Sequence, residues 1–257
     1  MTLITVFWLS LVEGVTEFLP VSSTGHMVLL AHFLGLDLHT PEVASFIILI
    51  QLGAILAVFA AFLKNISRNE IYRVMMAFLP TALVGFLLYK IVKTILITDP
   101  LVVAWALLLG GIVMLLADKF LFPKIKVVQN GKIEELSYLR AALVGLIQAL
   151  SVIPGVSRAM ASILGGRMAG LAETEAIRFS FLLATPTIAA ATAYDLYKTG
   201  LSNTNLNWQT GLGFILAFIF AYLVVIFFNK HYQKLSFTFF GWYRVILGGV
   251  VLLVLLN

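Results

Sequence analysis

The chain has 257 residues, of which 61% are hydrophobic and 11% are charged. A soluble domain carries about a quarter charged residues, so this composition excludes one and predicts a single all-α, polytopic membrane domain over residues 1–257. The absence of cysteine excludes disulfides and thiolate metal sites, and the net charge of +5 suits basic cytoplasmic loops better than nucleic-acid binding.

In chain order, the sequence begins with an apolar region that is interrupted, residues 2–35, cut at Pro20. Three uninterrupted apolar segments of spanning length follow, and then a second interrupted region, residues 138–170, cut at Pro154-Gly155. Three more spanning segments complete the chain. The six predicted spans are residues 43–63, 74–92, 100–118, 178–197, 210–229 and 238–256.

Each half of the two interrupted regions has about 15 residues, whereas a helix needs about 20 to cross a bilayer. Non-helical backbone at membrane depth must be buried in protein or line a cavity. Both regions are therefore predicted to be re-entrant helical hairpins, with a kinked full-length helix as the alternative. The N-terminal region lacks a basic stretch before its apolar run, so no cleaved signal peptide is predicted.

The two halves of the chain also resemble each other. Leu11–Ser23 aligns with Leu146–Arg158, and Glu42–Phe46 aligns with Glu175–Phe179. Each half consists of one hairpin and three spans, and since three is odd, the second half must enter from the opposite face. This pattern predicts an inverted-topology repeat whose broken helices meet near the midplane. Repeat 1 covers about residues 1–120, a linker about 121–137, and repeat 2 about 138–257.

The basic residues are distributed unequally over the two faces of this layout. The face opposite the N-terminus receives Lys64, Arg68, Arg73, Lys119, Lys124, Lys126, Lys132, Arg140, Arg167, Arg178, Lys230 and Lys234, while the N-terminal face receives Lys90, Lys93 and Lys198. By the positive-inside rule the first of these faces is cytoplasmic. Both termini and the mouth of the first hairpin are therefore expected outside the cytoplasm.

The first break is rich in groups that can do chemistry. Glu13 and Glu17 are four residues apart and share a helix face, where they could bind a divalent ion, act as a base and its partner, or face water at an interface. Ser22, Ser23 and Thr24 precede the second half-helix, where hydroxyls cap a helix and free N–H groups bind anions; capping alone is the alternative. His26, one turn further, could serve a hydroxyl or a phosphate oxygen, or be structural.

The second break offers an oxyanion cradle. Gly155, Ser157 and Arg158 stand at a helix start, and arginine makes bidentate contacts to phosphate; an arginine that only snorkels is the alternative. Ser162 could add a hydroxyl one turn later. Gln51 and Arg244 are polar residues inside spans and are interpreted as supporting or packing residues. Together the two breaks fit phosphoryl transfer.

The motifs at both breaks closely resemble the undecaprenyl-diphosphatase family of bacterial membranes, also known as bacitracin-resistance proteins. The resemblance runs nearly end to end and is densest in Glu13–His26, Phe46–Ala57, Gln148–Ser162 and Phe179–Lys198. It implies hydrolysis of undecaprenyl diphosphate to the monophosphate and inorganic phosphate, which recycles the carrier lipid for peptidoglycan synthesis. It also implies a bacterial inner-membrane location, a site open to the outer face, and a divalent cation, Mg²⁺ or Ca²⁺.

The resemblance assigns roles to individual residues. Glu17, Ser23, His26 and Arg158 are the expected catalytic residues, with Ser23 favoured as nucleophile; direct attack by water is the alternative. The expected substrate-binding residues are Glu13, Ser22, Thr24, Gly155, Ser157, Ser162 and Gln51, and Glu13 and Glu17 are the candidate metal ligands. The second motif departs from the family pattern, because Ala159, Met160 and Ser162 stand where the family has serine, glycine and threonine.

A second function class is compatible with the same layout. Inverted repeats and broken helices are also the architecture of transporters, so an inverted-repeat transporter or polyprenyl-phosphate flippase is the alternative. Transport alone does not need the set of hydroxyl, imidazole and guanidinium groups, and this set favours the enzyme. The expected partners are an isoprenyl diphosphate lipid, the bilayer and a second copy of the chain in a homodimer, and no nucleic acid.

Overall fold

The computed structural model describes residues 1–37, 40–62, 66–92, 99–127, 130–199, 207–231 and 237–256. In these ranges the regular structure is entirely helical. The α-helices are α1 (Leu3–Thr16), α2 (Ser23–Phe33), α3 (Pro41–Phe62), α4 (Arg68–Ile91), α5 (Pro100–Leu116), α6 (Tyr138–Gln148), α7 (Arg158–Met168), α8 (Glu173–Thr199), α9 (Trp208–His231) and α10 (Phe237–Leu256). Short π and 3₁₀ turns are η3 (Ala117–Leu121), η4 (Phe122–Lys124), η5 (Ile133–Glu135) and η6 (Ala149–Val152).

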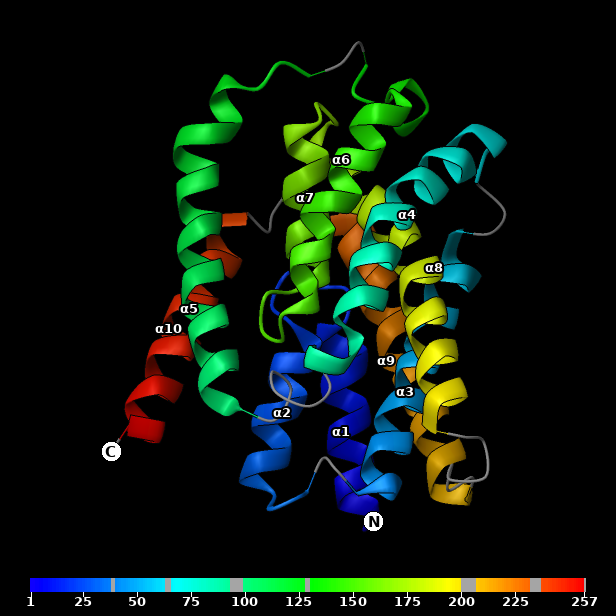
Figure 1. The fold of residues 1–257 in the computed structure, drawn as a ribbon, viewed down its shortest axis with the longest axis vertical. Coiled ribbons are helices and arrows are strands. Elements are labelled where there is room, and N and C mark those ends of the chain that lie inside the picture. The colour runs from blue at the N-terminus through cyan, green and yellow to red at the C-terminus, as the bar shows by residue number, and fades with distance from the viewer. Residues whose placement is uncertain are drawn as a thin grey trace.

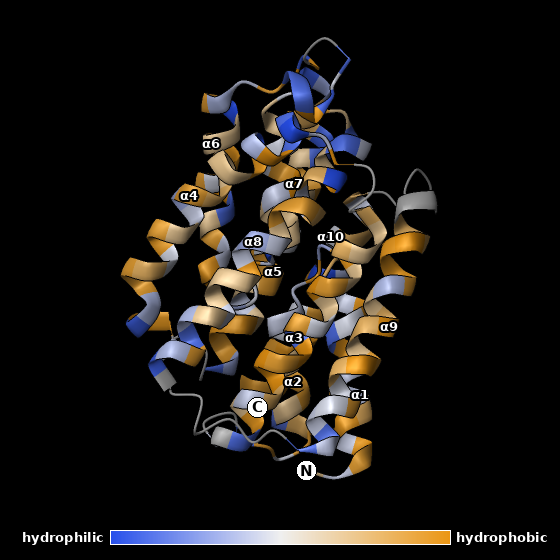
Figure 2. Cartoon of the chain, turned by 90° about the vertical axis from the view of Figure 1, so that its right-hand side faces the viewer, coloured by the Kyte–Doolittle hydropathy of each residue, from blue (hydrophilic) through white to orange (hydrophobic). Residues whose placement is uncertain are grey.

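The six predicted spans are confirmed. Within the described ranges, six helical stretches are long and apolar enough to cross a membrane, namely Glu42–Phe62, Arg68–Ile91, Pro100–Lys124, Glu173–Lys198, Trp208–Phe228 and Phe237–Leu256. Figure 2 shows apolar residues along these helices and hydrophilic residues at their ends, most densely where the linker between α5 and α6 lies. The chain is thus a multi-pass membrane protein. Residue 63 of the first span and Lys64, Lys93 and Lys234 of the charge distribution lie outside the described residues.

Capping signals explain where several helices begin. Ser67 and Glu70 form a capping box, in which each side chain bonds the other residue's backbone N–H, so α4 begins at Arg68 rather than at the predicted residue 74. Asp99 caps α5 through the N–H of Leu101, directly before Pro100 in the first turn. The apolar pattern alone places a helix start at the first apolar residue, whereas the cap extends the helix into polar sequence.

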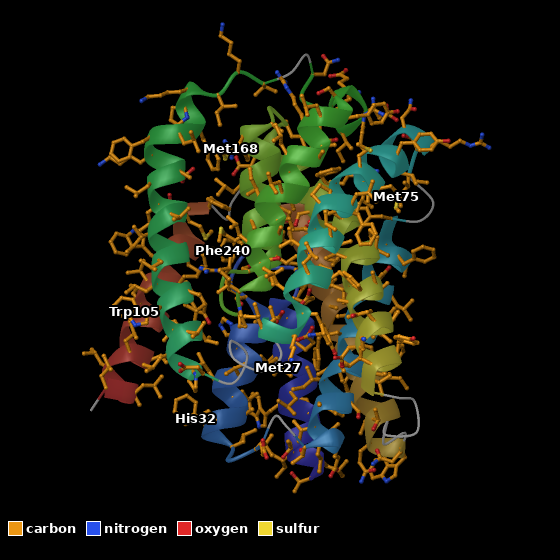
Figure 3. All side chains as sticks on the ribbon, viewed as in Figure 1. Met27, His32, Met75, Trp105, Met168 and Phe240 are labelled. Atoms are coloured by element: carbon orange, nitrogen blue, oxygen red, sulfur yellow. The ribbon has the colours of Figure 1, made fainter. Side chains whose placement is uncertain are left out.

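The two interrupted regions form two helical hairpins. In the first, α1 and α2 are joined by residues 17–22, and in the second, α6 and α7 are joined by η6 and residues 153–157. The hairpins enter the bundle from opposite ends and their tips meet in the middle (Figure 1). Accordingly His32, in the last turn of α2, and Met168, at the end of α7, lie toward opposite ends of the molecule (Figure 3). That these hairpins re-enter a membrane from its two faces remains a prediction.

The packing of the first five helices recurs in the second five. Helix α1 packs on α9 as α6 packs on α4, α3 packs on α9 as α8 packs on α4, and α5 packs on α10. This is the packing expected of an inverted-topology repeat in which α1 to α5 correspond to α6 to α10. The α5–α10 pair lies on one side of the hairpins, and α3, α4, α8 and α9 lie on the other (Figure 1). Both chain ends lie at one end of the bundle (Figure 1).

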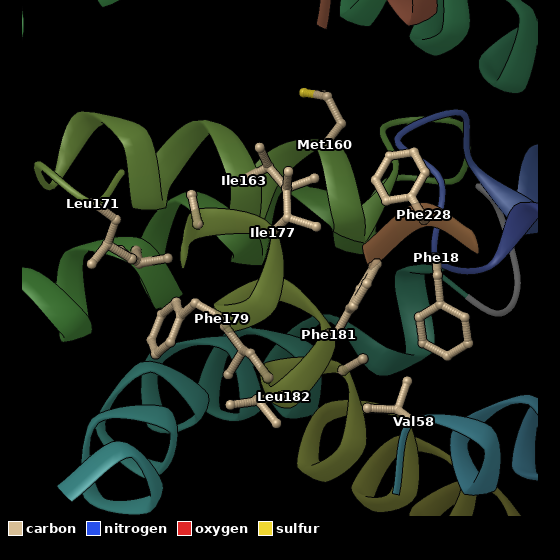
Figure 4. Close-up of a cluster of buried hydrophobic side chains, with 14 of the residues drawn as sticks. Phe18, Val58, Met160, Ile163, Leu171, Ile177, Phe179, Phe181, Leu182 and Phe228 are labelled. Atoms are coloured by element: carbon tan, nitrogen blue, oxygen red, sulfur yellow. The ribbon is translucent and has the colours of Figure 1, made fainter. Parts of the chain in front are cut away.

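A hydrophobic cluster contacts both hairpin tips. Its buried aromatic residues include Phe18 from the first break, Phe181 from α8 and Phe228 from α9 (Figure 4). The rings of Phe18 and Phe181 meet edge to face, with centroids 5.6 Å apart. Met160, in the first turn of α7, is 5% exposed and belongs to the same cluster. This cluster covers one side of the polar tips with apolar side chains, and it keeps bulk water away from that side.

Candidate active site

The two breaks share an unusual backbone conformation. Ser22 and Ser157 have φ angles of 75° and 72°, and they are the only residues other than glycine with positive φ in the described ranges. Each serine is the N-cap of the helix that follows: Ser22 Oγ accepts from the Gly25 N–H at 3.2 Å, and Ser157 Oγ accepts from the Met160 N–H at 3.2 Å. Such conformations cost about 1–3 kcal/mol each and gather at functional sites, so the same strained device marks both tips.

The tips touch through glycine. A Cβ atom added to Gly25 would lie 3.5 Å from the Cα of Gly155, so the first turn of α2 lies directly against the second break. Gly155 has a φ of 95°, and a Cβ there would lie 2.7 Å from the carbonyl oxygen of Val103 on α5. Glycine is required at 155 both by the conformation and by the close approach of α5.

Three of the four residues that were predicted to be catalytic come together at this contact. The hydroxyl of Ser23, the first residue of α2, donates a hydrogen bond to Glu17 Oε2. The guanidinium of Arg158, the first residue of α7, donates from Nη2 to Glu17 Oε1 at 2.8 Å. Glu17 therefore links a hydroxyl from the first break to a cation from the second, across a sequence separation of 141 residues.

Arg158 is held rigidly. Its Nη2 also donates to the backbone carbonyl of Glu17 at 3.1 Å, and its Nη1 donates to the carbonyl of Ser180 on α8 at 3.1 Å. The guanidinium lies 5.7 Å from the ring centroid of Phe18. Its side chain is 10% exposed and that of Glu17 is 7% exposed, so the ion pair acts where little water screens it. Its Nε atom is buried and has no hydrogen-bond partner among the described residues.

Glu13 is a fully buried carboxylate at the site. It is 0% exposed, and neither carboxylate oxygen receives a hydrogen bond from another described residue. The charged groups acting on it are Glu17 and Arg158. A buried carboxylate without a donor must bind a proton or share a cation. Among the described residues, however, no three histidine, aspartate or glutamate side chains cluster as a metal cage, so a cation here would need further oxygens from a ligand.

His26 is fixed at both ring nitrogens. Its Nδ1 lies 2.7 Å from the backbone carbonyl of Ser22, and its Nε2 lies 2.7 Å from the hydroxyl of Tyr243 on α10. A carbonyl can only accept, so Nδ1 carries the proton and donates, and in the neutral ring Nε2 accepts from the tyrosine hydroxyl. The imidazole and phenol rings are parallel within 4°. His26 therefore does not bond Ser23 in this arrangement.

Free backbone donors surround the same point. The N–H groups of Ser23 and Thr24 in α2, and of Arg158 and Ala159 in α7, bond no other described residue, because the serine caps satisfy only the third N–H of each helix. Two helix N-termini with unpaired donors therefore point into one small region. This is a favourable environment for an anion such as phosphate.

Three predicted residues lie outside this contact network. Ser162 is fully buried, and its hydroxyl lies 2.8 Å from the carbonyl of Arg158 and 2.7 Å from Ser180 Oγ, so it braces the start of α7. Gln51 is half-buried on α3 and bonds no other described residue. Thr24 is half-buried in the first turn of α2, and its backbone N–H is one of the unpaired donors described above.

The structure adds two residues on α10 that sequence reasoning did not place in the site. Tyr243 contacts His26 across 217 residues of sequence, and no local sequence pattern predicts this contact. Arg244 was interpreted as a supporting or packing residue, and it donates hydrogen bonds to backbone carbonyls of both breaks, at Pro20 and Gly155. The signal for Arg244 was an ionisable residue inside a spanning helix, which is a functional-site hypothesis by default.

An apolar groove begins beside the second tip. It has a volume of about 610 Å³ and runs between α5 and the α6–α7 hairpin. Val156 and Met160, which flank Ser157 and Arg158 in sequence, are among its lining residues, and Asp99 is its only charged lining residue. Trp105, which is 49% exposed on α5, also lines it. Met160 therefore places its bulk in the core and the groove.

Comparisons with known proteins identify the family of the chain. The family model described as bacitracin resistance protein BacA matches residues 6–250 of the chain. The chain is similar to the undecaprenyl-diphosphatase of Aquifex aeolicus (strain VF5), at 46% identity over 243 residues that cover 93% of each protein. It is also similar to the undecaprenyl-diphosphatase of Wolinella succinogenes, at 46% identity over 95% of this chain and 94% of that protein. The corresponding enzyme of Sulfurihydrogenibium sp. (strain YO3AOP1) is 43% identical over 96% and 97%.

Proposed function

Since this chain belongs to the family of bacitracin resistance protein BacA, a bacterial membrane family, we propose that it hydrolyses undecaprenyl diphosphate to undecaprenyl phosphate and inorganic phosphate. This reaction returns the carrier lipid to peptidoglycan synthesis. The observation that carries the proposal is the direct linkage of Ser23, Glu17 and Arg158 between the two tips. A nucleophile bonded to a base that a third group orients is the signature of nucleophilic catalysis.

In the first step, Ser23 Oγ bonds to the terminal phosphorus. The bond between that phosphorus and the bridging oxygen breaks, and undecaprenyl phosphate leaves with the bridging oxygen. The hydroxyl proton passes to Glu17, which already accepts the hydrogen bond from Ser23. Glu17 is better placed for this proton than His26, whose two ring nitrogens face Ser22 and Tyr243.

Arg158 couples substrate binding to this proton transfer. In the structure its guanidinium bonds Glu17 Oε1. A phosphate at the tips competes for the same guanidinium, since arginine pairs with phosphate oxygens as well as with carboxylates. The Glu17 carboxylate then loses part of its positive partner and becomes a stronger acceptor for the Ser23 proton. Unpaired N–H groups of both helices stabilise the negative charge that builds on the phosphoryl oxygens.

In the second step, water attacks the phosphorus of the phosphoserine and the bond from phosphorus to Ser23 Oγ breaks. Glu17 returns its proton to Ser23 Oγ, and inorganic phosphate keeps the two protons of the attacking water. His26 holds the peptide of Ser22 through Nδ1 and so fixes the residue that directly precedes the nucleophile.

We further propose that Glu13 holds one divalent cation, Mg²⁺ or Ca²⁺, together with the substrate phosphates, while Glu17 is left to accept the Ser23 proton. The unpartnered oxygens of Glu13 fit this role, since Mg²⁺ is commonly held by one or two carboxylates together with substrate phosphates. The cation would neutralise charge on the diphosphate. Removing it with EDTA is expected to abolish phosphate release, and re-adding Mg²⁺ or Ca²⁺ is expected to restore it in the wild type but not in Glu13→Gln.

The isoprenyl chain lies in the apolar groove between α5 and α6–α7 under this proposal. Val156, one residue before Ser157, lines the groove, and the lining is almost wholly apolar. The enzyme resides in the bacterial inner membrane, with both termini and the mouth of the site outside the cytoplasm, as the charge distribution predicts. Because the chain lacks cysteine, single cysteines introduced at either terminus can be labelled in intact cells with an impermeant maleimide, and both are expected to react.

The test of the proposal is phosphate release by purified protein from undecaprenyl diphosphate in detergent. The expected result is release of one inorganic phosphate per diphosphate with accumulation of undecaprenyl phosphate. The same protein in vesicles, with fluorescent lipid diphosphate, reports movement between leaflets. Movement without hydrolysis would overturn the enzyme and support a flippase.

A further inference from the structure

Arg244 is the largest fully buried side chain described in the molecule. It lies within α10, is 0% exposed, and forms no ion pair with any described carboxylate. Its guanidinium donates only to backbone carbonyls: Nη1 to Pro20 at 3.3 Å, and Nη2 to Gly155 at 2.8 Å and Ala106 at 3.0 Å. Burying a cation with such partners is expensive, so these contacts need an explanation beyond packing.

The Pro20 and Gly155 carbonyls that Arg244 bonds occupy equivalent positions in the two breaks. In the alignment of the two halves, Pro20 corresponds to Gly155, because Leu11–Ser23 aligns with Leu146–Arg158. Each carbonyl lies two residues before a serine cap of positive φ, Ser22 or Ser157. One guanidinium therefore bonds the same backbone position in both breaks, and its third bond, to Ala106, ties this junction to α5.

The chain also keeps space for this guanidinium. Gly110 on α5 lies directly against it, and a Cβ there would collide with Arg244 Nη2. By contrast, a Cβ added to Gly249, which follows Arg244 on α10, would meet no atom within 4 Å. Other glycines of the α5–α10 contact, such as Gly111 and Gly248, are crowded by other atoms, and Gly110 is the one whose added Cβ would meet the Arg244 guanidinium.

The residues that follow the two clamped carbonyls are those that meet at the active site. Three residues after Pro20 comes Ser23, and three residues after Gly155 comes Arg158; both side chains bond Glu17. We propose that Arg244 is a positioning residue that fixes the two breaks to each other, so that Ser23 and Arg158 reach Glu17 together. This positioning role rests on the proposed hydrolase function. Arg244 itself does not contact substrate, because all of its bonds go to the backbone.

The test uses purified protein and undecaprenyl diphosphate, with phosphate release measured over a range of substrate concentrations. In Arg244→Gln, which can span only part of the junction, kcat is expected to fall at least about tenfold while KM changes less than about threefold, since transition-state geometry is lost but no substrate contact is removed. A kcat within twofold of wild type, or a raised KM with unchanged kcat, would overturn the inference. Wild-type hydrolysis in the same assay keeps the underlying function separate from this outcome.

A conservative variant separates geometry from charge. Arg244→Lys keeps the positive charge but lacks the planar fork that reaches several carbonyls, so its kcat is expected to stay below about one third of wild type. Full activity in Arg244→Lys would overturn the positioning role in favour of a charge effect.

A third variant reaches the guanidinium without replacing it. Gly110→Ala is expected to lower kcat by displacing Arg244, while the matched Gly249→Ala keeps wild-type kcat. If both act through one contact, the double variant Arg244→Gln, Gly110→Ala is no slower than Arg244→Gln alone. Should Arg244→Gln fail to give a monodisperse protein, Gly110→Ala decides: unchanged kcat there would overturn the inference.

Discussion

The two breaks of this chain have the same backbone and different side chains. Both end in a serine of positive φ that caps the next helix, Ser22 and Ser157. The next position holds a hydroxyl in the first break, Ser23, and a guanidinium in the second, Arg158. Glu13 has no donor among the described residues, whereas the corresponding Gln148 bonds hydroxyls of α4 and α8. The repeated backbone brings two helix N-termini together, and under the proposed function the unlike side chains divide the chemistry into a reacting half and an anion-binding half.

The sharpest way to break this division is to remove the hydroxyl of the reacting half. Ser23→Ala is expected to lower phosphate release at least about a thousandfold, because the nucleophile and its proton path are both lost. The measurement is kcat on undecaprenyl diphosphate. Ser137→Ala is the matched control, since Ser137 only caps α6 at the linker end and should keep wild-type turnover. Near-normal turnover in Ser23→Ala would instead support direct attack by water.

The anion-binding half is tested by Arg158→Lys. Lysine keeps the charge but cannot bond Glu17, the Ser180 carbonyl and a phosphate from one planar group, so kcat/KM is expected to fall about a hundredfold. The rate at subsaturating substrate measures this effect. Arg140→Lys, at the exposed end of α6 where the guanidinium bonds the Ala169 carbonyl, is the control. Equal kcat/KM in Arg158→Lys and wild type would contradict an anion-binding role for the second break.

A smaller effect is expected from Tyr243→Phe. The change removes the hydroxyl that faces His26 Nε2 and leaves the ring stacking in place. One hydrogen bond of this kind contributes about 0.5–1.5 kcal/mol, so kcat is expected to fall about two- to tenfold. Tyr222→Phe, on a ring that stacks on Phe218 of α9, should leave kcat unchanged. A loss in Tyr243→Phe as large as that in Ser23→Ala would mean that Tyr243 takes part in the chemistry.

The smallest effects concern the shared backbone. Ser22→Gly and Ser157→Gly lose a cap but relieve the positive φ, so each is expected to change the free energy of unfolding by only a few tenths of a kcal/mol. The corresponding alanine variants lose the cap and keep the strain, and are expected to be less stable by about 1–2 kcal/mol. Thermal unfolding in detergent compares all four. If alanine were tolerated as well as glycine at either position, the strained cap would not be a shared device.

The sequence predicted most of the fold, and it singled out the polar residues that the structure brings together at the two breaks, for identifiable reasons. Six long apolar runs indicate six spans, so the positions of these helices follow from hydropathy. A proline in a short apolar region indicates a break, so the two hairpin tips follow from Pro20 and Pro154. Ser23, Glu17 and Arg158 were predictable because polar groups are rare in such sequence.

What the sequence could not predict depends on distant contacts. No local pattern gives Tyr243 a place beside His26, and the positive φ of Ser22 and Ser157 is invisible because serine rarely adopts it. The role of Ser162 also differs from a local interpretation: spacing placed its hydroxyl one turn from Arg158, but Ser180, on a helix that follows, engages it. Helix α4 begins before the predicted residue 74 because the capping box of Ser67 and Glu70 starts the helix in polar sequence, which apolar content alone does not predict.

The central claim is that the two breaks form one catalytic unit, and a double-mutant cycle between them tests it most directly. Glu17→Gln, Arg158→Gln and the double variant are compared with wild type by kcat/KM on undecaprenyl diphosphate. If Glu17 and Arg158 act as one unit, the double variant is expected to be no more than about threefold slower than the slower single variant. Losses that multiply in the double variant would show that the two residues act independently, and would contradict a site shared between the breaks.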